Sequence, residues 1–101
     1  MSTVIHGLLK EEKARNLEMQ RIHQSEIDSL PKGAVVAQKV NGRKYYYLRY
    51  RVGDKVLAKY LGNDQAIIDE TRYRIAHRKH LEGIIKRLKL EYKQICRVVK
   101  E

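Results

Sequence analysis

The chain has little of the residue patterns that mark secreted, disulfide-linked or membrane-spanning proteins. Its single cysteine, Cys96, excludes a disulfide within the chain. It lies beside Ile95 and Val99, and we interpret it as a small apolar core residue. No apolar run is long enough to cross a membrane, and residues 1–15 lack the basic and apolar regions of a secretory signal. We therefore expect a cytoplasmic protein.

Motifs that carry chemistry are also missing. The sequence has no Gly-rich phosphate loop, no Walker motif and no supported Ser-His-Asp arrangement. His77 and His80 are three residues apart, but no cysteine or carboxylate completes a zinc pattern around them. We therefore predict that the protein is not an enzyme, and we assign it no metal and no cofactor.

Positive charge is abundant, and it is unevenly distributed. Twenty-two Lys and Arg against twelve Asp and Glu give a formal net charge of +10 over 101 residues. Residues 31–62 hold eight basic residues and one acid, whereas residues 1–30 are close to neutral. A basic centre indicates an anionic partner, so we expect nucleic acid (DNA or RNA) or a host nucleoprotein, and no membrane.

This basic segment also has the pattern of a three-stranded antiparallel sheet. Asn41-Gly42 separates two β-prone runs and is the strongest short signal for a two-residue hairpin. Gly53-Asp54 marks the second turn. With these loops, the register places Tyr47 opposite both Val36 and Tyr60.

Side chains alternate across a strand, so this register divides them between two faces. One face has an aliphatic centre around Leu48, and we expect it to take the helices. The opposite face interleaves tyrosine with arginine and is the candidate binding surface. The candidate site comprises Arg43, Tyr45, Tyr47, Arg49 and Arg51 on this face, with Lys55 and Lys59 reaching round from the edge. Alternatively, the basic residues only solvate a small sheet and protect its edges from pairing.

Helices are expected before and after the sheet, which gives an α+β fold in a single domain. Residues 1–30 predict a helix that Pro31 ends. Residues 63–101 predict one long helix or a helical pair, capped at Asn63-Asp64. The sheet occupies residues 31–62 between them.

The apolar residues of the last segment change helical phase. Ile68 and Ile75 project away from the stripe that contains Leu88, by more than a third of a turn at roughly 100° per residue. The change falls between His77 and Gly83, so either the chain bends there or one helix packs on two partners. The later stripe is typical of a coiled coil and predicts a hairpin with the first helix or a homodimer seam.

Basic residues recur every seven positions along the same segment. They form a ridge roughly opposite the later apolar stripe. This ridge is either the solvent face of an amphipathic helix or an extension of the phosphate-binding surface. The secondary basic ridge consists of Arg72, Lys79, Lys86, Lys93 and Lys100.

The pattern of the sheet resembles a group of small prokaryotic and phage proteins of unknown function. The resemblance rests on Leu30-Pro31-Lys32-Gly33, on the run from Asn41 to Arg51, on Lys55-Val56 and on Lys59-Tyr60-Leu61-Gly62. It implies a tyrosine-rich sheet followed by a long charged helix. More distantly, the sheet is similar to the arm-type DNA-binding domains of tyrosine recombinases, whose small sheet enters the major groove. That similarity implies DNA binding.

Three functional hypotheses follow from these patterns. The first is a nucleic-acid-binding module that uses the face with alternating tyrosine and arginine. The second is an inhibitor carried by a phage or mobile element, of the anti-CRISPR type, that binds a host nuclease or nucleoprotein complex. The third is a coiled-coil adaptor that dimerises through the stripe around Leu88.

Overall fold

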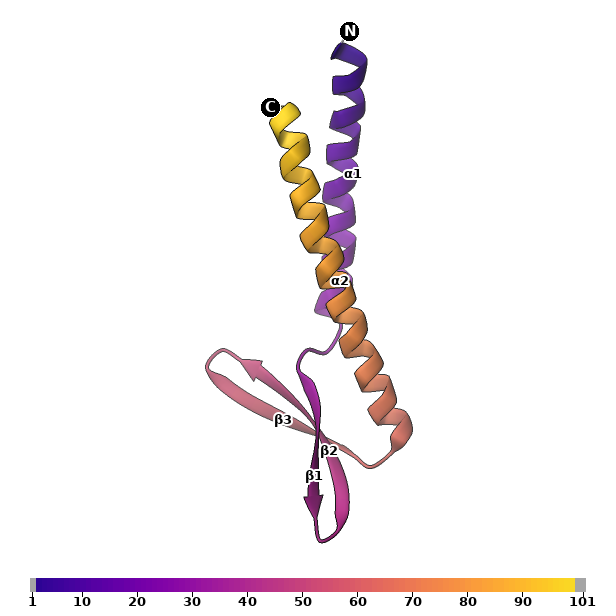
Figure 1. Cartoon of the computed structure of the whole chain (residues 1–101), viewed down its shortest axis with the longest axis vertical. Coiled ribbons are helices and arrows are strands. Elements are labelled where there is room, and N and C mark those ends of the chain that lie inside the picture. The colour runs from indigo at the N-terminus through magenta and orange to yellow at the C-terminus, as the bar shows by residue number, and fades with distance from the viewer. Residues whose placement is uncertain (1, 100–101) are drawn as a thin grey trace. The chain divides into compact units, whose positions relative to one another are not determined.

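The computed structural model describes residues 2–99 and has the order helix, three strands, helix (Figure 1). The elements are α1 (Ser2–Asp28), β1 (Ala34–Val40), β2 (Arg43–Val52), β3 (Lys55–Gly62) and α2 (Gln65–Val98). Both strand pairs are antiparallel, which confirms the predicted α+β fold with a three-stranded sheet between two helices. Lys100 of the predicted ridge lies outside the described residues.

The chain divides into two compact units. The helical unit combines the chain up to Ser29 with the chain from His80 onward, and the sheet unit runs from Leu30 to Lys79. The last segment was predicted to form one long helix or a helical pair. The structure has one continuous helix, since α2 runs unbroken from Gln65 to Val98. It therefore contributes residues to both units.

Each unit buries a different set of apolar side chains from α2. The sheet unit buries Ile68 and Ile75, and the helical unit buries Leu81, Ile85 and Leu88. The boundary between the units falls within the interval where the apolar pattern predicts a change of helical phase. The single helix α2 therefore has two apolar stripes, and each stripe is buried in a different unit.

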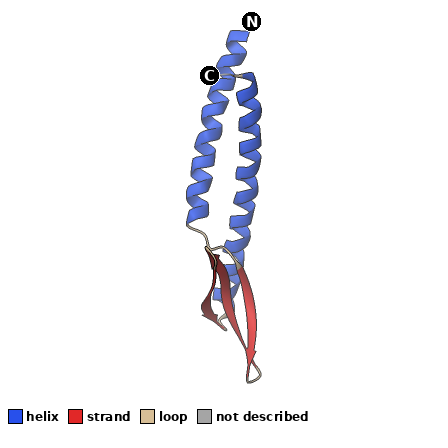
Figure 2. Cartoon of the chain, turned by 90° about the vertical axis from the view of Figure 1, so that its left-hand side faces the viewer, coloured by secondary structure: helices blue, strands red, loops and turns tan. Residues whose placement is uncertain are grey.

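In the helical unit, α1 lies side by side with the carboxy-terminal part of α2 and runs antiparallel to it (Figure 1, Figure 2). Ile27 of α1 and the stripe around Leu88 are buried within this hairpin. Asn16 is buried with them, and its side-chain amide donates to the Leu88 carbonyl oxygen over 2.9 Å. The stripe thus forms the predicted hairpin within one chain. A homodimer through α2 stays a prediction and would have to use other side chains or open the hairpin.

Replacing Asn16 by alanine is expected to destabilise the helical unit by about 1–2 kcal/mol, because two hydrogen bonds lose their partner in a buried position. The first is the bond to Leu88, and the second is the bond that the Gln20 amide donates to Asn16 over 2.6 Å. Urea unfolding followed by circular dichroism measures the loss. The matched control is Gln24→Ala, which removes an exposed bond to Asp28. Equal effects of the two substitutions would contradict a structural role for the buried amide.

Both hairpins of the sheet have the predicted turns. Asn41 and Gly42 have positive φ angles of 53° and 81°, as a type I′ turn requires. In the second turn Gly53 has a φ of 59°, while Asp54 is not in the positive region. This is the pattern of a type II′ turn, in which glycine holds the first central position.

The strand register also agrees with the prediction, except at one point. Tyr47 lies opposite Val36 on β1 and opposite Tyr60 on β3. The unpredicted feature is a β-bulge beside Tyr47, where Tyr46 pairs with Gly62. A bulge adds one residue to one strand and bends it, and Gly62 has the positive φ of 82° that this end of β3 needs.

The middle of β2 is the only part of that strand with neighbours on both sides. β1 pairs with Arg43–Arg49, and β3 pairs with Tyr46–Val52, so the two ladders overlap over Tyr46–Arg49. Beyond this overlap the sheet separates into two hairpin arms (Figure 1).

The face around Leu48 is the one that packs on α2, as predicted. Leu48 is 7% exposed, and its cross-strand partner Val35 lies beside Ile75 of α2. On the same face, the Arg72 guanidinium lies over the Tyr46 ring, 5.7 Å from its centroid.

Hydrogen bonds fix the ends of the α2 segment that belongs to the sheet unit. The Asp64 carboxylate accepts from the Ala66 backbone N–H over 3.0 Å, so Asp64 caps the helix. Towards the other end, Arg78 donates to the Leu30 carbonyl oxygen over 2.8 Å. This bond ties the chain that enters β1 to the helix that follows β3.

Gly33 cannot carry a side chain, because β1 begins in close contact with the backbone of β2. Its φ is 115°, and an added Cβ would lie 2.1 Å from the Arg49 carbonyl oxygen. Gly33→Ala is therefore expected to destabilise the sheet unit by about 2 kcal/mol or more. Urea unfolding followed by tyrosine fluorescence measures this loss.

Gly83→Ala is the matched control for this substitution. Gly83 lies within α2, and an added Cβ there would meet nothing within 4 Å. This change should stabilise the protein by about 0.5–1 kcal/mol, because alanine is the better helix former. Unchanged stability of the Gly33→Ala protein would show that the close approach does not constrain the sheet.

Candidate nucleic-acid interface

Three tyrosine rings gather on the face of the sheet opposite Leu48. Tyr45 and Tyr47 are alternate residues of β2, and Tyr60 comes from β3. The Tyr60 ring centroid lies 5.3 Å from that of Tyr47 and 6.3 Å from that of Tyr45, with both pairs tilted. Tyr45 and Tyr47 are half-buried, whereas Tyr60 is 58% exposed. The cluster therefore holds two rings firmly and presents the third to solvent.

Three arginines continue this face along β2. Arg43, Arg49 and Arg51 occupy alternate positions with the two β2 tyrosines, and all three are exposed. Together with Tyr45, Tyr47 and Tyr60 they form the Tyr–Arg face. At about 3.4 Å per residue the arginines extend over about 27 Å of strand.

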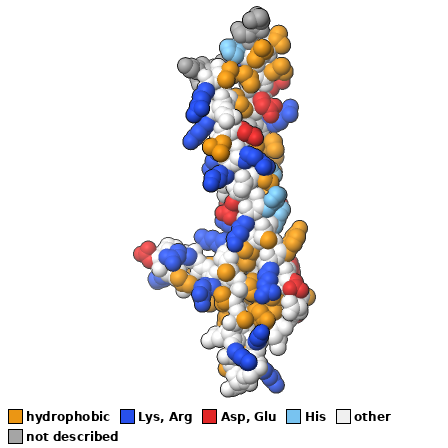
Figure 3. Space-filling view, in the orientation of Figure 1, with side chains coloured by type: hydrophobic (Ala, Val, Ile, Leu, Met, Phe, Trp, Pro, Cys, Tyr) orange, Lys and Arg blue, Asp and Glu red, His pale blue; other side chains and the backbone are white. Residues whose placement is uncertain are grey.

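The cross-strand neighbours of these arginines carry no charge. Arg49 lies between Ala34 and Ala58, and Arg51 lies opposite Val56. No Asp or Glu occurs in any of the three strands. In the space-filling view, Lys and Arg side chains are scattered among hydrophobic ones over the sheet, and they outnumber the acidic side chains there (Figure 3). The positive charge of the Tyr–Arg face is therefore not offset by cross-strand acids.

The two lysines of the predicted site lie on the other face. Lys59 pairs with Leu48 and Lys55 pairs with Val52, so the register places them with the residues that face α2. Both are exposed and belong to the edge strand β3. That they reach round this edge to a ligand stays a prediction.

The secondary basic ridge is divided between the two units. Arg72 and Lys79 belong to the sheet unit, where they line a shallow hollow beside β1. Lys86 and Lys93 belong to the helical unit. All four side chains are exposed, and neither unit contains the whole ridge.

Tyr60 is the residue that the predicted site lacked. Its pairing with Tyr47 follows from the turn lengths, so the signal was present in the register. The hollow lined by Arg72 and Lys79 was also not predicted as a site. It depends on how α2 packs on β1, for which the local sequence gives no direct sign.

The arrangement suits non-covalent recognition of a polyanion. Exposed aromatic rings stack on unpaired bases, and exposed guanidinium groups donate in pairs to phosphate oxygens. Over residues 2–99, no three His, Cys, Asp or Glu side chains come together to hold a metal ion. Neither described helix is both long and apolar enough to cross a membrane.

Comparison with known proteins defines the family of this chain and no function. Residues 9–72 match the model of a domain of unknown function, DUF6788, so the chain belongs to that family. The match extends from α1 through the whole sheet and into the first part of α2. No curated protein and no solved structure matches the chain.

Proposed function

We propose that this protein binds nucleic acid through the Tyr–Arg face of its sheet. The observation that carries the proposal is the exposed Tyr60 ring, packed against Tyr47 and flanked on the same face by Arg49 and Arg51. An aromatic ring that packs against a neighbouring ring and is otherwise exposed to solvent can stack on a base. The adjacent guanidinium groups supply the contacts to phosphate.

The exposure of the two residue types separates this interpretation from simple core packing. Tyrosines that only fill a core would be buried, yet Tyr60 keeps more than half of its surface in solvent. Arginines that only protect an edge would lie where a strand has a free side, yet Arg49 lies in the part of β2 that pairs with both β1 and β3. Both features favour a binding surface.

A tilted cluster of rings favours single strands or loops over a regular duplex. Stacking needs bases that are out of the helical stack, as in single-stranded DNA or RNA. The rings are tilted by 40° and 56° to one another, so successive bases would have to turn as they cross the sheet. We therefore place single-stranded nucleic acid first among the ligands.

Reversing the charge of two arginines is expected to weaken binding to fluorescent single-stranded DNA or RNA by roughly a hundredfold or more. The substitutions are Arg49→Glu with Arg51→Glu, and each replaces a phosphate contact by a repulsion. Fluorescence anisotropy gives the affinity, and circular dichroism checks that the exposed positions tolerate the change. In the milder Gln pair, the slope of log K against log salt should fall by about 1.5.

The matched control is Lys86→Glu with Lys93→Glu. It makes the same change of net charge on exposed residues of α2 that belong to the helical unit. An equal loss in both pairs would contradict a specific role of the Tyr–Arg face, because it would assign binding to net charge or to the secondary basic ridge. Weak binding of the unmodified protein to every form of DNA and RNA would contradict the proposal and favour the inhibitor hypothesis.

Replacing Tyr60 by leucine tests stacking separately from charge. Leucine keeps an apolar group over Tyr47 but has no π face, so affinity for a single strand should fall by roughly tenfold. The slope of log K against log salt should not change, because no phosphate contact is lost. Tyr73→Leu is the control, since Tyr73 is 71% exposed but lies on α2. Equal affinities of the Tyr60 variant and the unmodified protein would exclude stacking by this ring.

A further inference from the structure

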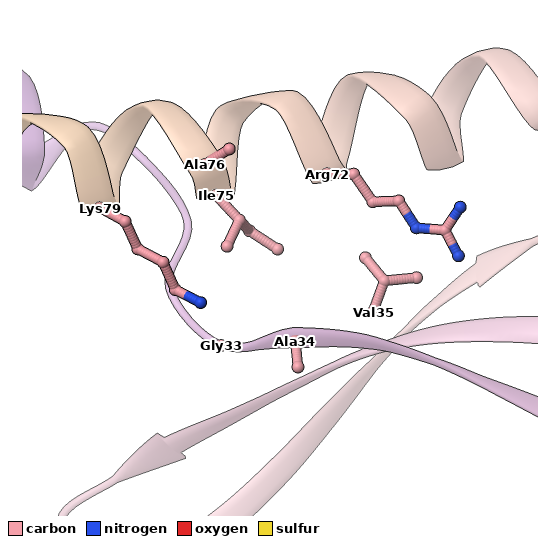
Figure 4. Close-up of a pocket in the computed structure, with 7 residues that line it drawn as sticks. All are labelled: Gly33, Ala34, Val35, Arg72, Ile75, Ala76 and Lys79. Carbon is pink, nitrogen blue, oxygen red and sulfur yellow. The ribbon is translucent and has the colours of Figure 1, made fainter.

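A second site candidate lies on the face of the sheet opposite the Tyr–Arg face. It is a shallow hollow of about 260 Å³ between the start of β1 and the first part of α2 (Figure 4). One side is lined by Gly33, which directly precedes β1, and by Ala34 and Val35 of β1; α2 lines the other side with Arg72, Ile75, Ala76 and Lys79. All of these residues belong to the sheet unit.

The floor of the hollow is apolar and its two ends are cationic. Val35 points toward α2, and Ile75 lies on the side of α2 that faces β1 (Figure 4). Arg72 and Lys79 stand at opposite ends, seven residues apart, which is about 10.5 Å along a helix. No acid lines the hollow. A ligand that fits must therefore combine an apolar group with negative charge on either side of it.

Arg72 is held in place while its hydrogen-bond donors stay accessible. Its guanidinium lies over the Tyr46 ring at 5.7 Å, and the side chain as a whole is exposed. A guanidinium that rests on an aromatic face keeps its N–H groups in the plane of the group, free to meet a carboxylate.

β1, whose first residues line the hollow, adds a third feature, because its free edge has backbone hydrogen-bonding capacity. β1 pairs with β2 alone, so it is an edge strand of the sheet. Edge strands present a row of N–H and C=O groups to which an extended peptide can add as a further strand. This feature favours a peptide over a nucleic acid, because a sugar-phosphate backbone has no N–H and C=O groups that could pair with a β-strand.

We propose that this hollow binds an extended acidic peptide of a protein partner. In an extended peptide, residues i, i+2 and i+4 lie on one face, and i and i+4 are about 13 Å apart. Carboxylates at i and i+4 reach Lys79 and Arg72, while a branched apolar side chain at i+2 enters the hollow over Val35 and Ile75. The protein thereby gains a protein-binding site that is independent of its nucleic-acid face.

The test is a two-dimensional amide NMR titration of the whole chain with the peptide Ser-Asp-Ser-Leu-Ser-Asp-Ser. The expected result is saturable shifts of the amides of Gly33, Val35 and the α2 residues from Arg72 to Lys79. The same peptide with both Asp changed to Asn, or with Leu changed to Gly, should bind more weakly. Shifts confined to other residues, or equal shifts with all three peptides, would overturn the proposal.

Variants of the protein test the charges and the hollow separately. Arg72→Gln with Lys79→Gln should weaken peptide binding by roughly tenfold, because two exposed ion pairs are lost and each contributes modestly. Lys86→Gln with Lys93→Gln is the matched control and should have little effect, because neither residue lines the hollow. Ala76→Leu fills the hollow without changing the charge and should also weaken binding. Full affinity in both hollow variants would overturn the assignment.

Two further ligands identify the source of the negative charge. Inorganic phosphate at the same concentration should not reproduce the shifts, because it has no apolar group. A single-stranded oligonucleotide should shift the Tyr–Arg face and leave the hollow unchanged. If either ligand perturbs the hollow as the peptide does, the site is not a peptide site. These results do not depend on the Arg49 and Arg51 variants, so failure of one proposal is distinguishable from failure of the other.

Discussion

The sheet depends on the double pairing of four residues in the middle of β2. From Tyr46 to Arg49 the strand has β1 on one side and β3 on the other, and elsewhere it has one neighbour. A strand paired on both sides cannot slip by one residue without breaking both ladders and turning its side chains over. This segment therefore decides that Leu48 faces α2 and that Tyr47 and Arg49 face away. Gly33 adds to the constraint, because its missing side chain lets the chain approach the Arg49 backbone.

Most of this fold could be predicted because its signals are local. Asn41-Gly42 and Gly53-Asp54 specify turns whose loop length fixes the register, and the register fixes the faces. The change of helical phase after Ile75 likewise predicts that different turns of α2 are buried differently, as the structure has it. The bulge beside Tyr46 was not predictable in this way, because no turn signal marks the extra residue that β3 has between Tyr60 and Gly62. The choice between a continuous and a bent α2 also required three-dimensional information.

The candidate sites differ in how much of them the sequence contains. The Tyr–Arg face is a strand-level feature, because alternation alone groups Tyr45, Tyr47, Arg49 and Arg51. The hollow is a tertiary feature, since it requires α2 to place Arg72 and Lys79 beside the start of β1. In the sequence these two cations look like members of a heptad ridge with Lys86 and Lys93. In the structure, Arg72 and Lys79 differ from Lys86 and Lys93 because they lie beside the start of β1, and their spacing along the chain is the same.

The alternation that groups the tyrosines and arginines also separates the two proposed sites. The pleat sends neighbouring residues of β2 in opposite directions, so Tyr47 and Leu48 serve different faces although they are adjacent in sequence. One face needs an apolar centre because a three-stranded sheet is not stable without a packed helix. The other face does not need an apolar centre, because no helix has to pack on it. It can therefore carry the exposed Tyr60 and unpaired positive charge at little cost in stability. A small basic sheet with one covered face thus has room for a polyanion on its open side and for a short peptide beside the covering helix.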